Sequence, residues 1–407
     1  MEFKQTQLDN GLQIVAELNP FVHSMGIGFF VRTGSRDETL EVSGVSHFLE
    51  HMAFKGFGGF SADDLNRMFD DVGAMYNAST SEEVTQYYAA ILPEYLPQTF
   101  ELLAGILFPT LLEADFNLEK KVIQEEIGMY ADMPGFTVYE KSMEAHFTGH
   151  PLGQSILGTH DSIEALTVEQ MRSYHASHYR AGNITLAVAG NTSWEEILTL
   201  AGQYCSHWNP GKHERSTREA KPRPYTHFLK QPIQQEHVML VLPAPPAESE
   251  LRYAADMLAM IIGDDTGSRM YWDIVDPAYA DSADFGYSDY DGSGVWMSYL
   301  ACAPEDVADN LRRFEAILDD VTARGVTENE LEQARNKLSS RIVLGGERPM
   351  ERLGALGANW VYRHEYQSVE DDLALVQAIA QDDLRKLIEQ YPLKIATTYG
   401  LGPLEGL

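Results

Sequence analysis

Two stretches far apart in the chain resemble each other: TQYYAAILPEYLPQTFELLAGIL at 85–107 and WMSYLACAPEDVADNLRRFEAIL at 296–318. Their Pro-Glu steps, 93–94 and 304–305, lie 211 residues apart, and so do their Ile-Leu steps. Extended without gaps, this offset also pairs Gly56 with Gly267. One constant offset over most of a domain indicates an internal duplication, with two related units of about 200 residues.

The local patterns around these stretches mix strands and helices. Each unit has strand pairs that can be antiparallel and amphipathic segments that can cover one face of a sheet. Ser61 followed by Asp64 reads as a capping-box start of a helix. We therefore expect an α+β fold of two homologous α/β-sandwich domains, each a mostly antiparallel sheet with helices packed on it. Strands are expected at 12–18, 24–34, 77–92, 184–191 and 237–245, and helices at 42–54, 61–72, 94–108 and 117–129.

A polar segment, WNPGKHERSTREAKPRPYTHF at 208–228, separates the two copies. It contains several prolines, gathers basic residues in an otherwise acidic chain, and offers few apolar positions for a core, so it reads as a linker. The predicted domains are 1–210 and 231–407, two homologous units joined by a linker at 211–230.

The charge of the chain narrows its possible partners. Thirty basic and 61 acidic residues give a formal net charge of −31. Nucleic acid and anionic membranes both demand a basic surface, so we expect neither as a partner. Two interpretations remain open: a highly soluble, solvated surface, or a cavity lined by acids that favours basic ligands.

The chain has no run of about 18 apolar residues, and its start lacks the features of a signal peptide. Its two cysteines, Cys205 and Cys302, fit a reducing compartment better than a disulfide framework. The expected location is the cytoplasm.

The segment SHFLEHMAFKG, Ser46–Gly56, places two imidazoles and a carboxylate within five residues of an apolar helix. His47 and His51 are i and i+4, so they project from one face and can meet one metal ion. Glu50 borders that face and can reach a metal-bound water. The order H-x-x-E-H inverts the common zinc-peptidase motif. Taken alone, such a short motif can also arise by chance or serve packing.

The second copy provides an internal control. At the same offset, the positions of His47, Glu50 and His51 hold Leu258, Ile261 and Ile262. Aliphatic residues can therefore build this helix, which favours a functional reason for the polar ones.

A catalytic zinc usually takes a third protein ligand and keeps one position for water. The segment NLEKKVIQEEIGM offers Glu119, Glu125 and Glu126. Glu119 and Glu126 are seven residues apart and share a helical face, whereas Glu125 points about 100° away. Acids on a helix are often only a solvated face. At the offset of 211, however, Glu126 pairs with Lys337. The two copies therefore differ at the position where the first would need a metal ligand.

With these motifs in view, the chain resembles the pitrilysin/insulinase family of zinc metallopeptidases. It is similar to the mitochondrial processing peptidase β subunit and to short bacterial homologues. The resemblance rests on GVSHFLEHMAFKG at 44–56, NASTSEEVTQYYA at 77–89 and EKKVIQEEI at 119–127, and it spans essentially the whole chain.

The resemblance implies that 1–210 is a zinc-binding catalytic domain and that 231–407 is a homologous domain without metal ligands. It also implies roles for the motif residues. His47, His51 and Glu126 would bind one Zn²⁺ per chain, and Glu50 would act as general base. Glu119 would be a supporting catalytic acid behind the ligands.

The resemblance also implies where substrate binds. Asn77 and Ala78 would lie on an edge strand that takes up a peptide by backbone hydrogen bonds. Active family members carry an Arg and a Tyr seven residues apart in the second domain. No such pair occurs in 231–407, and the aligned positions hold Val275 and Ser282. The candidates to substitute are Tyr287, Tyr279 and Arg269.

The same region, 268–292, is rich in acids. They form either an exposed acidic loop or an acidic patch that faces the peptide. The residues concerned are Asp276, Asp281, Asp284, Asp289 and Asp291.

Together these observations predict a zinc endopeptidase that cleaves peptides or extended segments in an enclosed chamber. The expected partners are a peptide substrate and a second chain, in a homodimer or in a heterodimer with a related chain. One alternative is a catalytic-type subunit that needs a different partner chain to supply the Arg/Tyr pair. Another is a non-catalytic peptide-binding or assembly subunit.

Overall fold

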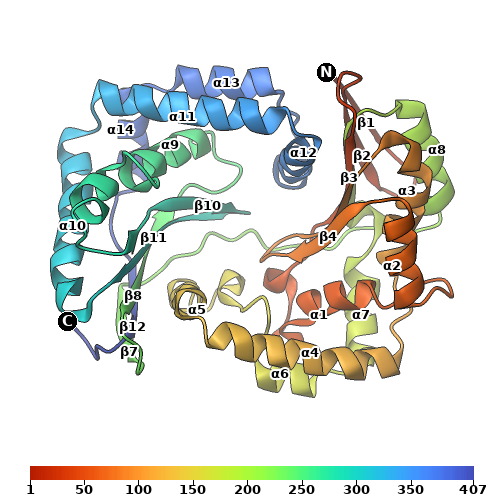
Figure 1. The fold of residues 1–407 in the computed structure, drawn as a ribbon, viewed down its shortest axis with the longest axis horizontal. Coiled ribbons are helices and arrows are strands. Elements are labelled where there is room, and N and C mark those ends of the chain that lie inside the picture. Colours follow the sequence, from red (N-terminus) through yellow and green to blue (C-terminus); the bar gives the residue numbers. More distant parts are fainter. The chain divides into compact units, whose positions relative to one another are not determined.

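Two open sheets organise the computed structural model, which describes residues 1–407 (Figure 1). The chain divides into two compact units. Unit 1 comprises residues 1–128, 154–215 and 344–367, and unit 2 comprises 129–153, 216–343 and 368–407. The expected fold class, two α/β sandwiches with mostly antiparallel sheets, is confirmed.

Unit 1 is built on a six-stranded sheet in the order β1-β2-β6-β3-β5-β4, in which only β2 and β6 run parallel. The strand bounds are β1 Glu2–Gln7, β2 Gln13–Leu18, β3 Met25–Val31, β4 Met75–Thr80, β5 Thr85–Ile91 and β6 Ile184–Gly190. The helices are α1 Val45–Ala53, α2 Ala62–Asp71, α3 Leu96–Ile106, α4 Glu113–Ala131, α6 His160–Ala165, α7 Val168–His178, α8 Trp194–Cys205 and α12 Pro349–Arg363.

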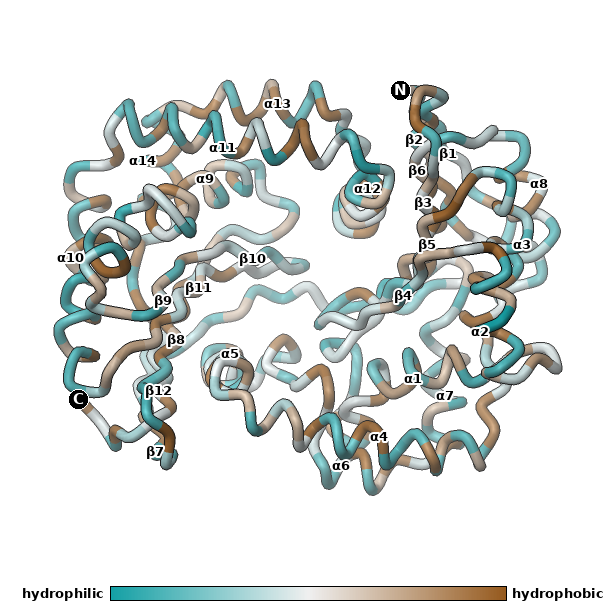
Figure 2. Tube along the Cα trace, viewed as in Figure 1, coloured by the Kyte–Doolittle hydropathy of each residue, from teal (hydrophilic) through white to brown (hydrophobic).

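Unit 2 repeats this plan around a sheet in the order β10-β11-β8-β12-β7, with β9 paired to β11. Its strands are β7 Tyr225–Lys230, β8 Glu236–Ala244, β9 Ser282–Ala283, β10 Gly286–Tyr290, β11 Ser293–Cys302 and β12 Thr397–Gly402. Its helices are α5 Pro134–His146, α9 Arg252–Gly263, α10 Val307–Arg324, α11 Glu328–Gly346, α13 Val369–Ala378 and α14 Gln381–Gln390. Along α11 and α13, hydrophilic and hydrophobic residues alternate, as expected for helices with one buried face (Figure 2).

The helices and strands expected from the sequence are present in the structure. The capping box of α2 forms as expected, with the Ser61 side chain accepting from the Asp64 backbone and Asp64 accepting from the Ser61 backbone. The stretch expected as β at 77–92 is the β4–β5 hairpin. None of the helices combines the length and the apolar character that crossing a bilayer requires.

The two units do not follow the chain continuously, because each contains a helix from the other part of the sequence. α12 packs on the sheet of unit 1, where Leu353 and Trp360 join a core with Val15 and Phe30. α5 packs on the sheet of unit 2, where Val138 and other apolar residues meet β8 and β12. The predicted domains, 1–210 and 231–407, divide the sequence in order, so they differ from the compact units by these two exchanged helices.

Buried charge anchors α12 to its sheet. Arg352 donates from Nε to Glu17 Oε1 at 2.9 Å and from Nη2 to Glu17 Oε2 at 2.5 Å, and Tyr366 also donates to this carboxylate. Both partners of the ion pair are almost fully buried. Gly357 allows close packing, because a Cβ there would fall 2.2 Å from the Phe30 ring. Of the predicted linker, 211–230, residues 211–224 contain no helix or strand, whereas the last six residues form β7 of unit 2, so the linker is shorter than predicted.

Candidate metal centre

Helix α1 places the two histidines. One face of α1 buries Phe48, Leu49 and Met52 in the core of unit 1. The opposite face carries the buried His47 and the partly buried Glu50 and His51. The helix begins at Gly44, whose φ of +90° favours glycine and where a Cβ would lie 2.6 Å from a backbone oxygen. The backbone N–H groups at its start donate to the buried Glu38 carboxylate, from Gly44 at 2.6 Å and from Ser46 at 2.7 Å. These contacts fix the start of the helix.

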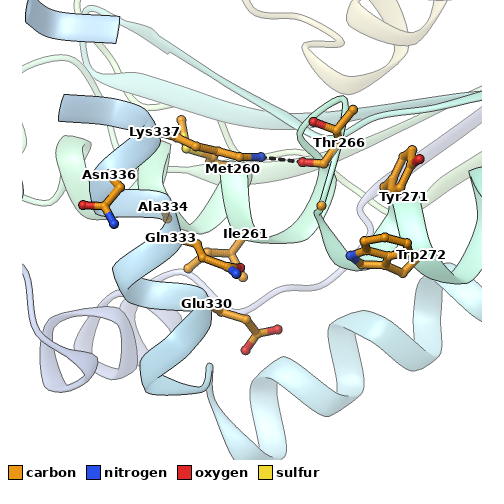
Figure 3. A pocket seen from close by; sticks show the side chains of 11 residues that line it. Met260, Ile261, Thr266, Tyr271, Trp272, Glu330, Gln333, Ala334, Asn336 and Lys337 are labelled. Carbon is orange, nitrogen blue, oxygen red and sulfur yellow. Dashed lines mark hydrogen bonds between the residues drawn. The ribbon is translucent and has the colours of Figure 1, made fainter. Parts of the chain in front are cut away.

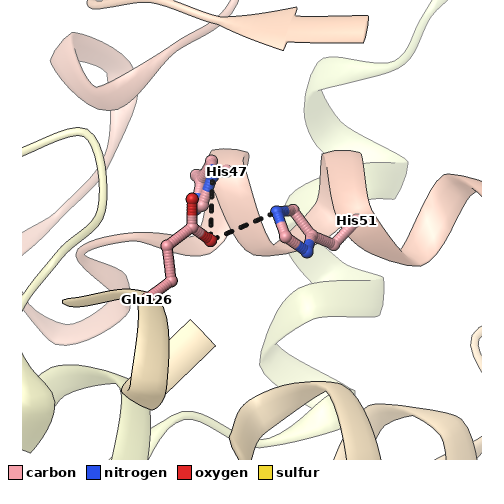
Figure 4. Close-up of side chains that lie close together, drawn as sticks. All are labelled: His47, His51 and Glu126. Atoms are coloured by element: carbon pink, nitrogen blue, oxygen red, sulfur yellow. Dashed lines mark ion pairs between the residues drawn. The ribbon is translucent and has the colours of Figure 1, made fainter. Parts of the chain in front are cut away.

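Helix α4 brings the third group to α1. Its buried Phe116 and Ile123 pack into the core and orient the face that carries Glu126. Glu126 Oε2 lies 3.5 Å from His51 Nε2 and 3.9 Å from His47 Nε2 (Figure 4). One ligand atom from each of the three residues lies within 4.8 Å of the others. The structure thus brings His47, His51 and Glu126 together, while the neighbouring Glu125 is exposed.

The donor set of this cluster fits a zinc ion. Two imidazole nitrogens and one carboxylate oxygen are typical catalytic zinc ligands, and three protein ligands leave a position for water. Glu126 Oε2 is buried and has no hydrogen-bond partner, although it points at two imidazole nitrogens. A buried carboxylate oxygen without a partner is costly, and a cation among the three atoms would satisfy it.

Glu119 supports the cluster from behind. Its Oε1 lies 2.9 Å from His51 Nδ1, and its Oε2 forms an ion pair with Lys55 Nζ at 2.5 Å. Burial acts to raise the pKa of Glu119, but the hydrogen bonds from His51 and Lys55 outweigh it, so the pKa lies below its usual value. The contact at Nδ1 leaves His51 Nε2 directed at Glu126, the arrangement by which carboxylates orient metal-binding histidines.

The two imidazoles differ in their electrostatic surroundings. Burial, aided by the neighbouring His51, lowers the pKa of His47 to about 3, so His47 is neutral near pH 7. Burial also acts to lower the pKa of His51. The hydrogen bond to Glu119 and the charges of Glu126 and Glu50 outweigh that effect and raise it.

Glu50 lies beside the three-residue cluster and is not part of it. Its Oε2 accepts a hydrogen bond of 2.8 Å from Thr80 Oγ1 at the end of β4. Burial raises the pKa of Glu50, and the charge of Glu126 acts in the same direction, while the Thr80 hydroxyl opposes the shift. A raised pKa makes the Glu50 carboxylate a stronger base than an exposed glutamate.

Sequence reasoning missed Thr80 and Lys55. Both residues belong to the motifs: Thr80 lies in NASTSEEVTQYYA at 77–89, and Lys55 lies in GVSHFLEHMAFKG at 44–56. Their contacts connect separate segments, and no spacing rule would have indicated their partners.

The expected peptide-binding strand is at an edge. Asn77 and Ala78 lie in β4, the last strand of its sheet, which pairs only with β5. Ala78 is buried in the core, and its backbone N–H donates to the Asn77 side chain at 2.9 Å.

Tyr287, the third predicted substrate-binding residue, lies in β10 of unit 2. Its hydroxyl donates to the Pro245 carbonyl at 2.7 Å, and its ring packs against the core. Arg269 is also engaged, since it pairs with Asp320 and Glu330. The acidic residues nearby are not all loop residues: Asp289 lies in β10 and Asp291 is buried, whereas Asp276, Asp281 and Asp284 are exposed.

The equivalent place in unit 2 holds different side chains. Leu258, Ile261 and Ile262 of α9 are buried in the core, as the duplication predicts. Beside them, α9 and α11 line a pocket of about 480 Å³ that includes Trp272 and Lys337 (Figure 3). Lys337 donates to Asp264 at 2.7 Å and to the Thr266 carbonyl. This pocket has no counterpart of the two histidines.

Helix α4 and its counterpart α11 are offset by more than the sequence comparison assumed. α4 begins at Glu113 and α11 at Glu328, an offset of 215, whereas β5 and β11 end at Ile91 and Cys302 and keep 211. Glu119 and Glu126 therefore correspond to Ala334 and Arg341, and the predicted pairing of Glu126 with Lys337 is wrong by one helical turn. α10 extends to Arg324, seven residues beyond the equivalent of the α3 end, and the loop after it is three residues shorter, so the net shift is four residues.

The duplicated sandwich with one metal-ligand cluster defines a class of two-domain chain, and comparison with known proteins identifies its family. Residues 13–160 match the family model described as insulinase (peptidase family M16), and residues 165–338 match the peptidase M16 inactive domain. The chain belongs to the insulinase family, peptidase family M16.

Relatives and solved structures agree with this assignment. An uncharacterized zinc protease of Streptomyces coelicolor is 30% identical over 415 residues, which cover 99% of this chain and 90% of the relative. The uncharacterized zinc protease YmxG of Bacillus subtilis is 30% identical over 391 residues, or 95% of each chain. The crystal structure of a protease from Helicobacter pylori shares the fold, with a TM-score of 0.92 at 22% identity, covering 98% of this chain and 99% of that one.

Proposed function

We propose that this protein is a zinc-dependent endopeptidase that hydrolyses peptides or extended polypeptide segments. The observation that carries the proposal is the convergence of His47, His51 and Glu126 beside Glu50. It is supported by membership of a peptidase family in which similar chains are named zinc proteases. We further propose, on the inverted motif HxxEH at 47–51, that within this family the chain resembles the mitochondrial processing peptidase β subunit and short bacterial homologues.

The residues of this chain have distinct roles in the proposed reaction. One zinc ion per chain, held by His47, His51 and Glu126, would supply a Lewis acid that lowers the pKa of water and polarises a carbonyl. Glu50 accepts the proton of the attacking water and later delivers it to the leaving amine. Thr80 fixes the Glu50 carboxylate through its hydroxyl. Glu119 keeps His51 in the orientation that a ligand needs.

Substrate reaches this site along the edge strand. A peptide that pairs with the free edge of β4 near Asn77 and Ala78 is held by backbone hydrogen bonds, and these recognise extended chains more than particular side chains. Since Thr80 of the same strand touches Glu50, such a peptide is drawn past the general base.

The decisive variant is Glu50→Gln, which keeps the shape of the side chain and removes its basicity. We expect peptide hydrolysis to fall by at least about a hundredfold, in line with the loss of general base catalysis. Zinc content should be unchanged, because Glu50 is not a ligand. Metal analysis and cleavage of a fluorogenic peptide measure both quantities on the same sample. Substantial turnover by a zinc-loaded Glu50→Gln protein would overturn the assignment of the base.

The absence of the Arg/Tyr pair from 231–407 favours a second candidate, a catalytic-type subunit that works only with a different partner chain. Val275 and Ser282 occupy the aligned positions, and Arg269 is committed to ion pairs. Purified chain that binds zinc but cleaves nothing alone would support this candidate. A chain with neither zinc nor activity would support a non-catalytic peptide-binding or assembly role, against which the intact cluster weighs.

We propose a homodimer or a heterodimer with a related chain as the working form. We also propose a cytoplasmic location, because Cys205 and Cys302 are both buried and unpaired, as is common where thiols stay reduced.

A further inference from the structure

The hairpin of β4 and β5 has two faces with different surroundings. Ala78 faces the core beneath α1, and Thr80 reaches Glu50, so the even-numbered residues of β4 point to the metal side. The odd-numbered residues, which include Met75 and Asn77, therefore point to the opposite side. On β5, Tyr88 lies on that opposite side with the core that α12 covers.

A cavity of about 490 Å³ opens on this opposite side, within unit 1. The sheet supplies Phe30, Gln86 and Tyr88, β4 supplies Met75 and Asn77, and the first turns of α12 supply the remaining wall, including Met350 and Gly354. Its volume falls in the range of small-ligand pockets, about 300–1,000 Å³, and exceeds what one side chain fills. Met75 lies 78% exposed beside it.

We propose that this cavity is a specificity subsite that takes a bulky apolar side chain of a peptide bound at the β4 edge. This rests on the proposed function. Successive side chains of an extended strand point to opposite faces of the sheet, so a peptide added to β4 presents one set to the metal side and the alternate set to the cavity. The cavity thus recognises side chains at every second position of the bound peptide.

The lining determines the preferred chemistry. Phe30, Tyr88, Met75 and Met350 give aromatic and thioether surface, which favours large apolar side chains. The amide groups are already engaged, since Asn77 accepts from the Ala78 backbone and Gln86 donates to Ser79 at 2.8 Å.

The charges around the cavity make it unfavourable for acidic side chains. The single ionisable group in the lining, apart from the tyrosines, is the exposed Glu351 carboxylate, and no cation lines the cavity. Acidic side chains are therefore disfavoured, and phenylalanine, leucine and methionine fit best.

Gly354 offers a direct way to fill the cavity. A Cβ built there meets no atom within 4 Å, in contrast to Gly357 of the same helix. Because Gly354 is helical and glycine is a poor helix former, a larger residue adds bulk to the cavity with no backbone penalty.

The test compares Gly354→Leu with wild type on peptide sets in which each position near the scissile bond carries Phe or Ala. In wild type, Phe should be preferred at positions of one parity. In Gly354→Leu the Phe-to-Ala ratio of kcat/KM at those positions should fall at least about tenfold, as expected when a bulky apolar group loses its pocket. Gly354→Ala, which adds one methyl group, should give a smaller fall.

Gly202→Leu is the matched control. Gly202 is exposed on α8, and a Cβ there also meets no atom within 4 Å, so this variant should keep the wild-type preference. Equal preferences of wild type, Gly354→Leu and Gly202→Leu would overturn the subsite while leaving the peptidase intact. If wild type cleaves no peptide, fluorescence anisotropy of the labelled Phe peptides still tests the subsite: weaker binding to Gly354→Leu than to Gly202→Leu supports it, and equal binding overturns it.

Discussion

Two adjacent glutamates on α4 have opposite surroundings. Glu126 faces His47 and His51, while Glu125 is rotated by about 100° around the helix and is exposed. Glu126 is therefore a candidate metal ligand, whereas Glu125, which carries the same charge, belongs to the solvated surface. This contrast makes the pair an internal control for the metal centre.

Glu126→Gln should weaken zinc binding by at least about a hundredfold, because even loss of a partner behind the ligands typically costs 10–100-fold. The amide keeps the shape and removes the negative charge that the ion needs. Glu125→Gln should leave the affinity unchanged. Competition with a chromogenic chelator measures both dissociation constants. Equal losses in the two variants would show that Glu126 is not a ligand.

At this scale the sequence predicted what lies within one helix. The spacing of His47, Glu50 and His51 follows from helical geometry alone, and so does the distinction between Glu125 and Glu126. Thr80 was not predicted, since its contact with Glu50 depends on how β4 packs beside α1. A single sequence carries no direct record of such contacts.

Helix α1 depends on a group outside itself at its start. The N-cap residue of α1, Gly44, has no side chain that could cap the helix. The Glu38 carboxylate instead accepts hydrogen bonds from the backbone N–H groups of Gly44 and Ser46. The free N–H groups at a helix start need such partners when they are buried. Glu38 thereby fixes the helix that carries His47, Glu50 and His51.

Glu38→Ala should lower the free energy of unfolding by about 1–3 kcal/mol, the usual cost of leaving buried backbone donors unpaired. Glu41→Ala is the control, because Glu41 is exposed close by in the chain. Urea unfolding followed by circular dichroism compares the two variants with wild type. Matching stabilities of the Glu38 and Glu41 variants would mean that the cap contributes little.

The elements show where the sequence comparison was sound and where it failed. The 211-residue offset holds for β5 and β11, since Met25 pairs with Ile91 in unit 1 as Glu236 pairs with Cys302 in unit 2. It does not hold for the pairing within the hairpins, because the turn is 81–84 between β4 and β5 but only 291–292 between β10 and β11. It fails at α4 and α11, because α10 is longer than α3. Helix ends on a surface tolerate such extensions, and nothing in the local pattern of 307–324 indicates where its partner helix should begin.

On the scale of the whole molecule, the duplication is accompanied by an exchange of helices. α5 and α12 occupy equivalent places in the two copies, and each covers the sheet of the unit formed mainly by the other copy. The amphipathic pattern of such a helix indicates that it covers a sheet, but either sheet offers a similar apolar face. The sequence therefore predicted two related domains without predicting which helix completes which one.

This exchange predicts that the chain cannot be divided at its linker into two stable domains. A fragment of residues 1–215 lacks α12, so it exposes the apolar face that Leu353, Leu356, Trp360 and Val361 cover and leaves Glu17 without Arg352. Burial of four such side chains contributes about 6–12 kcal/mol as an upper estimate, comparable to the whole stability of a typical domain, ~5–15 kcal/mol. Residues 1–215 expressed alone should aggregate or unfold without a cooperative transition, whereas co-expression with 216–407 should give a folded two-chain complex. Thermal unfolding and size-exclusion chromatography distinguish these states, and a cooperatively folded, monodisperse 1–215 fragment would contradict the dependence on α12.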